Sequence, residues 1–159
     1  MNGQRIVRYD VLGTAIFAVA MAIAVPLRNH RSGQVLIIAV SMALFAAGVV
    51  TALWSFAAAL ERSRTDDVGV TNLYLLSGTI APTRVRNTMW GCLGVQIVVA
   101  IAGATIGVVG LDEGRLNALA FGILVPMFGI GANGLWASHH GAYEPRRVAA
   151  ERPNNRKIG

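Results

Sequence analysis

Charged side chains are scarce in this sequence of 159 residues. They make up 14% of the chain, whereas a soluble domain typically has about 25%. Hydrophobic residues account for 54%, and the mean hydropathy is +0.54. This balance excludes an ordinary soluble domain, a disordered chain and a nucleic-acid-binding domain. It is typical of a small protein with several membrane spans.

Cysteine and lysine are almost absent. Cys92 is the only cysteine, so no disulfide forms within the chain, and its apolar neighbours indicate a packing residue. Lys157 is the only lysine, and the other 13 basic residues are arginines. The strong preference for arginine, together with abundant Ala, Gly and Val, is associated with bacteria. The arginines adjoin apolar segments, where membrane topology places them, so the net charge of +6 does not indicate a nucleic-acid partner.

Four apolar runs are long enough to cross a membrane as helices. They cover residues 11–27, 35–60, 88–110 and 116–138, and none of them contains a formally charged side chain. A helix of about 20 residues crosses the hydrocarbon core, and it satisfies its own backbone groups there. We therefore predict an all-α, four-helix transmembrane bundle within residues 1–141, with a loop at 61–87. Residues 142–159 are predicted to be a disordered, basic tail.

The first run has a second interpretation, which is a cleaved signal peptide. Arg5 and Arg8 would form its basic region, and Ala22-Ile23-Ala24 matches a cleavage site with small residues. Cleavage would leave three spans with the same orientation.

Basic residues predict the orientation of the bundle. The N-terminus, the middle loop and the tail lie on one side of the membrane and together carry 11 of them, whereas the two short loops of the other side carry three. Cytoplasmic loops are enriched in arginine and lysine. We therefore expect a multi-pass protein of the bacterial inner membrane with both termini in the cytoplasm.

Short connections at 28–34 and 111–115 predict two antiparallel helical hairpins. Each hairpin begins with an arginine five residues before a glycine and ends with Leu-Trp, a glutamate and two arginines. A duplication would relate the hairpins by a two-fold axis along the membrane normal. Basic ends and interfacial tryptophans that any two hairpins share would explain the same pattern, and the sequence leaves both interpretations open.

Small residues at helical spacing are candidates for helix packing, because close backbone approach drives association in lipid. The third run contains Gly103 and Gly107 in a GxxxG pattern, and the second has a small residue at every fourth position, including Ala43, Ala47 and Thr51. These stripes fit packing within the bundle. They also fit contact with another membrane protein or with a second copy of the chain.

The fourth run differs most from a simple membrane anchor. Pro126 removes a backbone hydrogen bond near its middle and is expected to kink the helix, and Asn133 follows among glycines. Gln96 is the corresponding amide of the third run. Together they form a candidate intramembrane polar site, with a packed kink as the alternative.

No motif for catalysis, a metal or a cofactor appears in the sequence. The runs contain no charged side chain, which argues against a proton-coupled transporter, a pump or an intramembrane enzyme. We therefore expect a protein that is not an enzyme, and a non-catalytic accessory or scaffold subunit of a membrane complex in particular. A small-molecule transporter or channel that uses the kinked fourth span is the alternative.

Arginines at the predicted membrane surface form a basic cluster expected to face anionic lipid headgroups. Its members are Arg62, Arg64, Arg84, Arg86, Arg146 and Arg147. Between them, residues 70–78 predict a short interfacial helix with Tyr74 at headgroup depth.

Residues 134–147, from Gly-Leu-Trp-Ala-Ser-His-His to Glu-Pro-Arg-Arg, close the last span and open the tail. This stretch, with the four-span pattern, resembles small actinobacterial membrane proteins. The resemblance implies the four-span fold and no activity.

Overall fold

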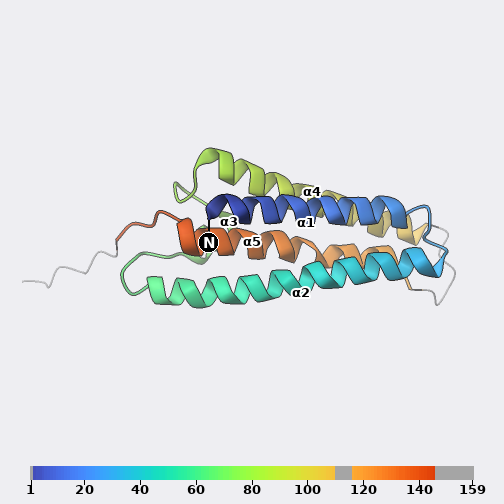
Figure 1. Ribbon diagram of the computed structural model, residues 1–159, viewed down its shortest axis with the longest axis horizontal. Coiled ribbons are helices and arrows are strands. Elements are labelled where there is room, and N and C mark those ends of the chain that lie inside the picture. Colours follow the sequence, from blue (N-terminus) through green and yellow to red (C-terminus); the bar gives the residue numbers. More distant parts are fainter. Residues whose placement is uncertain (1, 110–115, 146–159) are drawn as a thin grey trace, which may run out of the picture.

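The computed structural model describes residues 2–109 and 116–145, and most of them are helical. Four helical spans run side by side along the long axis of the molecule (Figure 1). They are α1 (Gly3–Ala24), α2 (Arg31–Arg62), α4 (Thr83–Val108) and a fourth span made of the 3₁₀ helix η1 (Ala118–Leu124) and α5 (Pro126–His140). Each is long and apolar enough to cross a membrane. The chain therefore has the architecture of a multi-pass integral membrane protein.

The bundle has two distinct ends. The terminal end contains Asn2, the connection between α2 and α4, and residues 141–145 after α5 (Figure 1). The far end contains the connection between α1 and α2. Short helix α3 (Val70–Leu75) lies at the terminal end, where it packs against α5 and buries Leu73. The loop that the sequence places at 61–87 is thus partly folded into the bundle.

Helix α1 begins eight residues earlier than the apolar run that predicts it. Asn2 is its N-cap, and the Asn2 side chain accepts a hydrogen bond of 3.2 Å from the Gln4 backbone N–H. Caps of this kind satisfy a backbone donor that the helix leaves free. The run 11–27 itself has no charged side chain, but the longer helix also includes Arg5, Arg8 and Asp10, of which Asp10 is buried.

The fourth span is interrupted where the sequence predicts a kink. Pro126 has no backbone N–H, so it cannot donate to the Gly122 carbonyl four residues earlier. Val125 donates to that carbonyl instead, at 3.0 Å, which is the spacing of a 3₁₀ turn. Helix α5 then begins at Pro126, where the missing N–H costs nothing. The proline therefore separates two helical segments rather than bending one continuous helix.

Two apolar clusters form the core, one toward each end of the bundle. The cluster at the terminal end includes Ile6, Met89 and Ala132, and the cluster toward the far end includes Phe17, Ala100 and Val125. In α1, in α4 and in the fourth span alike, one short stretch of chain separates the members of the two clusters. This intervening layer contains the polar side chains described below.

Candidate functional site

Asp10 is a fully buried carboxyl group inside the helical bundle. Its side chain is 0% exposed, and it lies seven residues into α1, roughly 10 Å from the start of that helix. Along α1 it falls between Ile6 and Phe17, which belong to the two apolar clusters. Burial of a carboxyl between apolar layers is costly, and such residues in membrane spans usually mark functional sites.

Gln96 of α4 is the main polar neighbour of Asp10. Its amide Nε2 donates to Thr14 Oγ1 at 2.7 Å and faces Asp10 Oδ1 at 3.4 Å. The Thr14 hydroxyl in turn donates to the Asp10 backbone carbonyl at 2.8 Å. Asp10 and Thr14 are one helical turn apart, so a single amide can reach both side chains. Gln96 is itself 0% exposed.

The other end of the Gln96 amide reaches the interrupted span. The Gly129 backbone N–H, in the first turn of α5, donates to Gln96 Oε1 at 3.2 Å. The first N–H groups of a helix lack partners within it, and here a side chain from α4 supplies one. An amide has one acceptor end and one donor end. Because Oε1 faces Gly129, the NH₂ group must face Asp10 and Thr14.

Two aromatic rings and a thiol lie beside this polar layer. Tyr9 and Phe128 lie with ring centroids 4.9 Å apart, and Gly13 leaves the space that the Phe128 ring occupies. Cys92 of α4 is close enough to interact with the Asp10 carboxyl. Within the described part of the chain, Asp10 Oδ2 is buried without a hydrogen-bond partner. The layer therefore presents one unused carboxyl oxygen in an otherwise bonded site.

The three residues of the candidate intramembrane polar site, Gln96, Pro126 and Asn133, do not form one site in the structure. Gln96 belongs to the Asp10 layer, and Pro126 starts the helix that the layer contacts. Asn133 lies one helical turn beyond Gly129 and donates through Nδ2 to the Tyr74 carbonyl at 3.0 Å. Tyr74 also donates its hydroxyl to the Ala52 carbonyl of α2 at 2.9 Å. Asn133 thus ties α5 to α3 near the terminal end.

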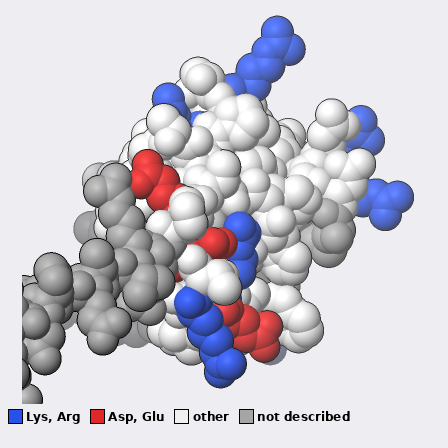
Figure 2. Space-filling view, turned by 90° about the vertical axis from the view of Figure 1, so that its left-hand side faces the viewer, with Lys and Arg blue, Asp and Glu red and all other residues white. Residues whose placement is uncertain are grey.

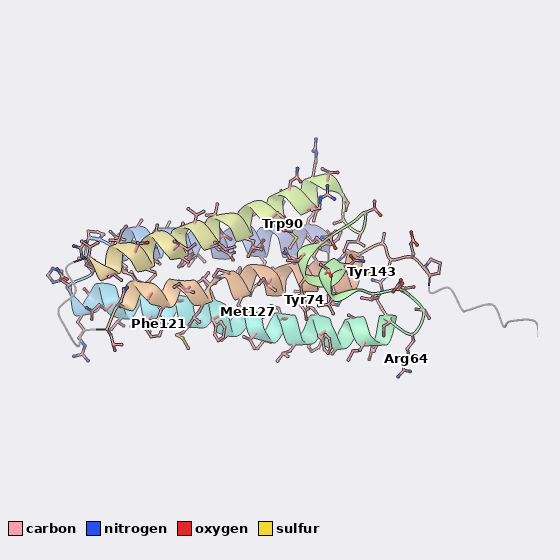
Figure 3. All side chains as sticks on the ribbon, turned by 180° about the vertical axis from the view of Figure 1, so that it is seen from behind. Arg64, Tyr74, Trp90, Phe121, Met127 and Tyr143 are labelled. Carbon is pink, nitrogen blue, oxygen red and sulfur yellow. The ribbon has the colours of Figure 1, made fainter. Side chains whose placement is uncertain are left out.

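Figure 3 shows Tyr74 and Tyr143 at the terminal end, the end from which Arg64 projects outward. Tyr74 is therefore placed inside the folded part of the connection between α2 and α4, where burial raises the pKa of its phenol. The interfacial helix expected around Tyr74 corresponds to α3, which packs on the bundle.

The residues predicted to pack helices together differ in their burial in the structure. Gly103 lies against the Met21 side chain and Gly107 against the Asn117 side chain, whereas Ala43 is exposed. Ala47 and Thr51 are half-buried, and Thr51 Oγ1 lies against Gly131.

The closest backbone approach occurs elsewhere, between α2 and α5. A Cβ atom on Gly48 would lie 2.6 Å from the backbone of Met127. Small-residue spacing in the sequence points to Gly103, because the run around Gly48 contains no second glycine to form a motif with it.

Arg62 differs from the lipid-facing arginine that the sequence predicts. Its guanidinium donates to the Ser138 carbonyl at 3.1 Å and to the Gly141 carbonyl at 3.2 Å, and it pairs with Asp66 at 3.3 Å. It also lies 5.0 Å from the centre of the Tyr143 ring. Burial raises the pKa of the Tyr143 phenol, and the Arg62 charge opposes that increase. Arg62 therefore fastens the end of α2 to the end of α5.

The other described members of the basic cluster lie nearer the surface. Arg64 and Arg84 are exposed, and Arg86 donates to the Gly78 carbonyl at 2.9 Å. Figure 2, which looks onto the terminal end, shows basic and acidic side chains distributed over this face. Arg146 and Arg147 lie outside the described residues.

Asp10 is the residue that the sequence interpretation missed. The apolar run that the sequence predicts begins at Val11, directly after Asp10, so this prediction leaves Asp10 outside the first span. A usable signal was present, because Asp10, Thr14 and the apolar residues Ile6 and Phe17 lie on one helical face.

No protein family model, curated protein or solved structure matches this chain.

Proposed function

We propose that this chain is a small transporter or channel of the bacterial inner membrane that works through the polar layer around Asp10. The observation that carries the proposal is the burial of Asp10 with one unpartnered carboxyl oxygen, between two apolar clusters. Ionisable residues in membrane spans are rare, and they commonly mark the path of a solute or an ion.

The interrupted fourth span supports the same function. Transporters often bind their substrates where a membrane helix is broken, because backbone groups at the break are available for binding. Here the break at Pro126 lies three residues from Gly129, which is bonded to Gln96. A seven-residue 3₁₀ segment such as η1 is longer than usual, and such stretches often mark hinges. The polar layer and the hinge are therefore directly connected.

Orientation and lipid contacts form part of the proposal. The terminal end, with both termini, lies in the cytoplasm, because it carries most of the basic residues. Exposed arginines there, such as Arg64 and Arg84, contact anionic headgroups. The protein carries no catalytic activity in this proposal.

A second candidate function is a non-catalytic accessory or scaffold subunit of a larger membrane complex. It is favoured by Ala39 and Ala43, which are exposed on the outer face of α2, and by a fully apolar groove of 380 Å³ between α1 and α2. Small residues facing lipid allow a helix of another protein, or of a second copy, to approach closely.

Reconstituted protein distinguishes the two functions. Currents are recorded from proteoliposomes on a solid support after concentration jumps in a panel of cationic, anionic and neutral small solutes. A transporter gives a transient current with at least one solute in the wild type, and Asp10→Asn loses it. No current across the panel, together with a stoichiometric partner after mild-detergent purification, would contradict the transporter and support the subunit.

A further inference from the structure

We infer that the polar layer is a proton-binding site, in which Asp10 holds the proton and Gln96 transmits its presence to α5. This inference rests on the proposed function only in naming the ion that would drive transport. The site itself stands on the geometry of three side chains and one backbone group.

The surroundings of Asp10 provide no positive charge to balance a carboxylate. The one ion pair among residues 2–109 and 116–145 joins Arg62 to Asp66. Arg5 and Arg8 lie on the same helix as Asp10 but are exposed. An isolated carboxylate is very unfavourable in a dry interior, so the group must either remain a neutral acid or acquire a cation.

Few titratable groups face Asp10 from the neighbouring helices. They are Tyr9 on α1 itself and Cys92 on α4. Helix α5 contributes the uncharged Phe128 ring and the Gly129 backbone. The charged residues of α2 lie only at its two ends, and η1 has none. Titration at this layer therefore belongs to the Asp10 carboxyl.

A metal ion does not fit the donors around the carboxyl. Gln96 directs its N–H groups toward Asp10, and its only oxygen is bonded to Gly129. The Thr14 hydroxyl accepts from Gln96 and donates to backbone. Hard cations such as Ca²⁺ and Mg²⁺ require about six or more oxygen ligands. In the described part of the chain, no three His, Cys, Asp or Glu side chains lie close enough together to hold a metal ion. A proton needs only the unpartnered Oδ2.

The contact between Gln96 and Asp10 depends on the charge of the carboxyl group. Gln96 Nε2 lies 3.4 Å from Asp10 Oδ1, and a hydrogen bond to an ionised carboxylate is roughly twice as strong as one to a neutral group. Loss of the proton would strengthen the attraction for the Gln96 NH₂ group. Because the amide is rigid, movement of Nε2 toward Asp10 draws Oε1 away from the Gly129 N–H. Deprotonation therefore weakens the contact that holds the first turn of α5.

Infrared spectroscopy of the full-length protein in lipid tests the proton site without any transport assay. The difference spectrum between wild type and Asp10→Asn is recorded over a pH series, in H₂O and in D₂O. We expect a protonated-carboxyl band at neutral pH that shifts in D₂O, is lost at alkaline pH, and does not respond to Na⁺. A carboxylate band alone at neutral and acidic pH, or loss of the acid band on addition of Na⁺ at fixed pH, would overturn the proton site.

Hydrogen exchange tests transmission to α5. After correction for the chemical dependence of exchange on pH, exchange at residues 127–130 should increase in step with the loss of the acid band. The same increase should be absent in Asp10→Asn, whose helical content by circular dichroism serves as the folding control. Two results would refute the link through Gln96. One is amide exchange that does not change when the acid band is lost, and the other is an equal increase of exchange in Asp10→Asn. If the protonated-carboxyl band is present but no solute gives a current, the proposed transport function is contradicted and the proton site is still supported.

Discussion

Gln96 on α4 accepts a hydrogen bond of 3.2 Å from the backbone N–H of Gly129 on α5, so one side chain stabilises the start of a helix that belongs to a different span. The same amide faces Asp10 on α1. Three of the four spans therefore meet at a single amide group. Disturbing either end of this amide is expected to affect the other end.

Substitution of Gly129 should disturb the polar layer from the α5 side. A Cβ atom at Gly129 would lie 2.7 Å from Gln96 Oε1, so Gly129→Ala must displace the Gln96 amide. We expect a loss of about 0.6–1.7 kcal/mol, from the average to the largest value measured for a hydrogen bond between membrane helices. Unfolding in a mixed-detergent titration measures this loss. Gly94→Ala on α4 is the matched control, because a Cβ there meets nothing within 4 Å. Equal stability of the two variants would contradict the Gln96 contact.

Gly48 should be less tolerant of substitution than Gly103. A Cβ at Gly48 would collide with the Met127 backbone, which cannot move independently, whereas a Cβ at Gly103 meets the flexible end of the Met21 side chain. Gly48→Ala is expected to cost about 1–3 kcal/mol, as overpacking usually does, and Gly103→Ala less than that. Thermal unfolding in detergent compares the two variants. The opposite order would place the tightest helix contact at the GxxxG pattern instead.

Removal of the Asn133 amide should have a small effect on stability. Asn133→Ala deletes the hydrogen bond to the Tyr74 carbonyl, which is expected to cost about 0.6 kcal/mol in a membrane protein. Because Asn133 lies outside the Asp10 layer, solute currents normalised to the amount of folded protein should remain at the wild-type level. Abolished currents in a fully folded Asn133→Ala protein would move the transport site toward α3.

Arg62 should contribute more to stability than Arg64. Its planar guanidinium reaches two carbonyls of the α5 terminus and Asp66 together, and the single ammonium group of a lysine cannot reproduce this arrangement. Arg62→Lys is expected to cost about 1 kcal/mol. Arg64→Lys provides the control, since the Arg64 side chain is exposed. Indistinguishable melting temperatures for the two variants would show that Arg62 does not hold α2 to α5.

Reporter fusions test the orientation. A reporter active only in the cytoplasm should give a signal when fused after Gly159, and a reporter active only in the periplasm should give one when inserted at Asn29. The expectation follows from the excess of basic residues at the terminal end. A periplasmic signal at Gly159 would reverse the orientation.

The sequence by itself determined the class of the protein and the number of its spans. Apolar runs of sufficient length predict membrane helices because the hydrocarbon core excludes unpaired backbone groups, whatever the neighbouring helices are. The position of the interruption at Pro126 was predictable as well, since the missing N–H is a local property of the chain. The start of α1 was not, because its cap lies outside the apolar run.

Only the tertiary structure decided which polar groups meet. Gln96 was recognisable as a polar residue in an apolar run, but its partners depend on the rotation and depth of α1 and α5 relative to α4. The two amides of the predicted polar site illustrate this, since Gln96 bonds to Gly129 whereas Asn133 bonds to Tyr74. Hydropathy is a sum over a segment, whereas a hydrogen bond requires two atoms within about 3 Å. The packing of the helices sets that distance, and with it the site around Asp10.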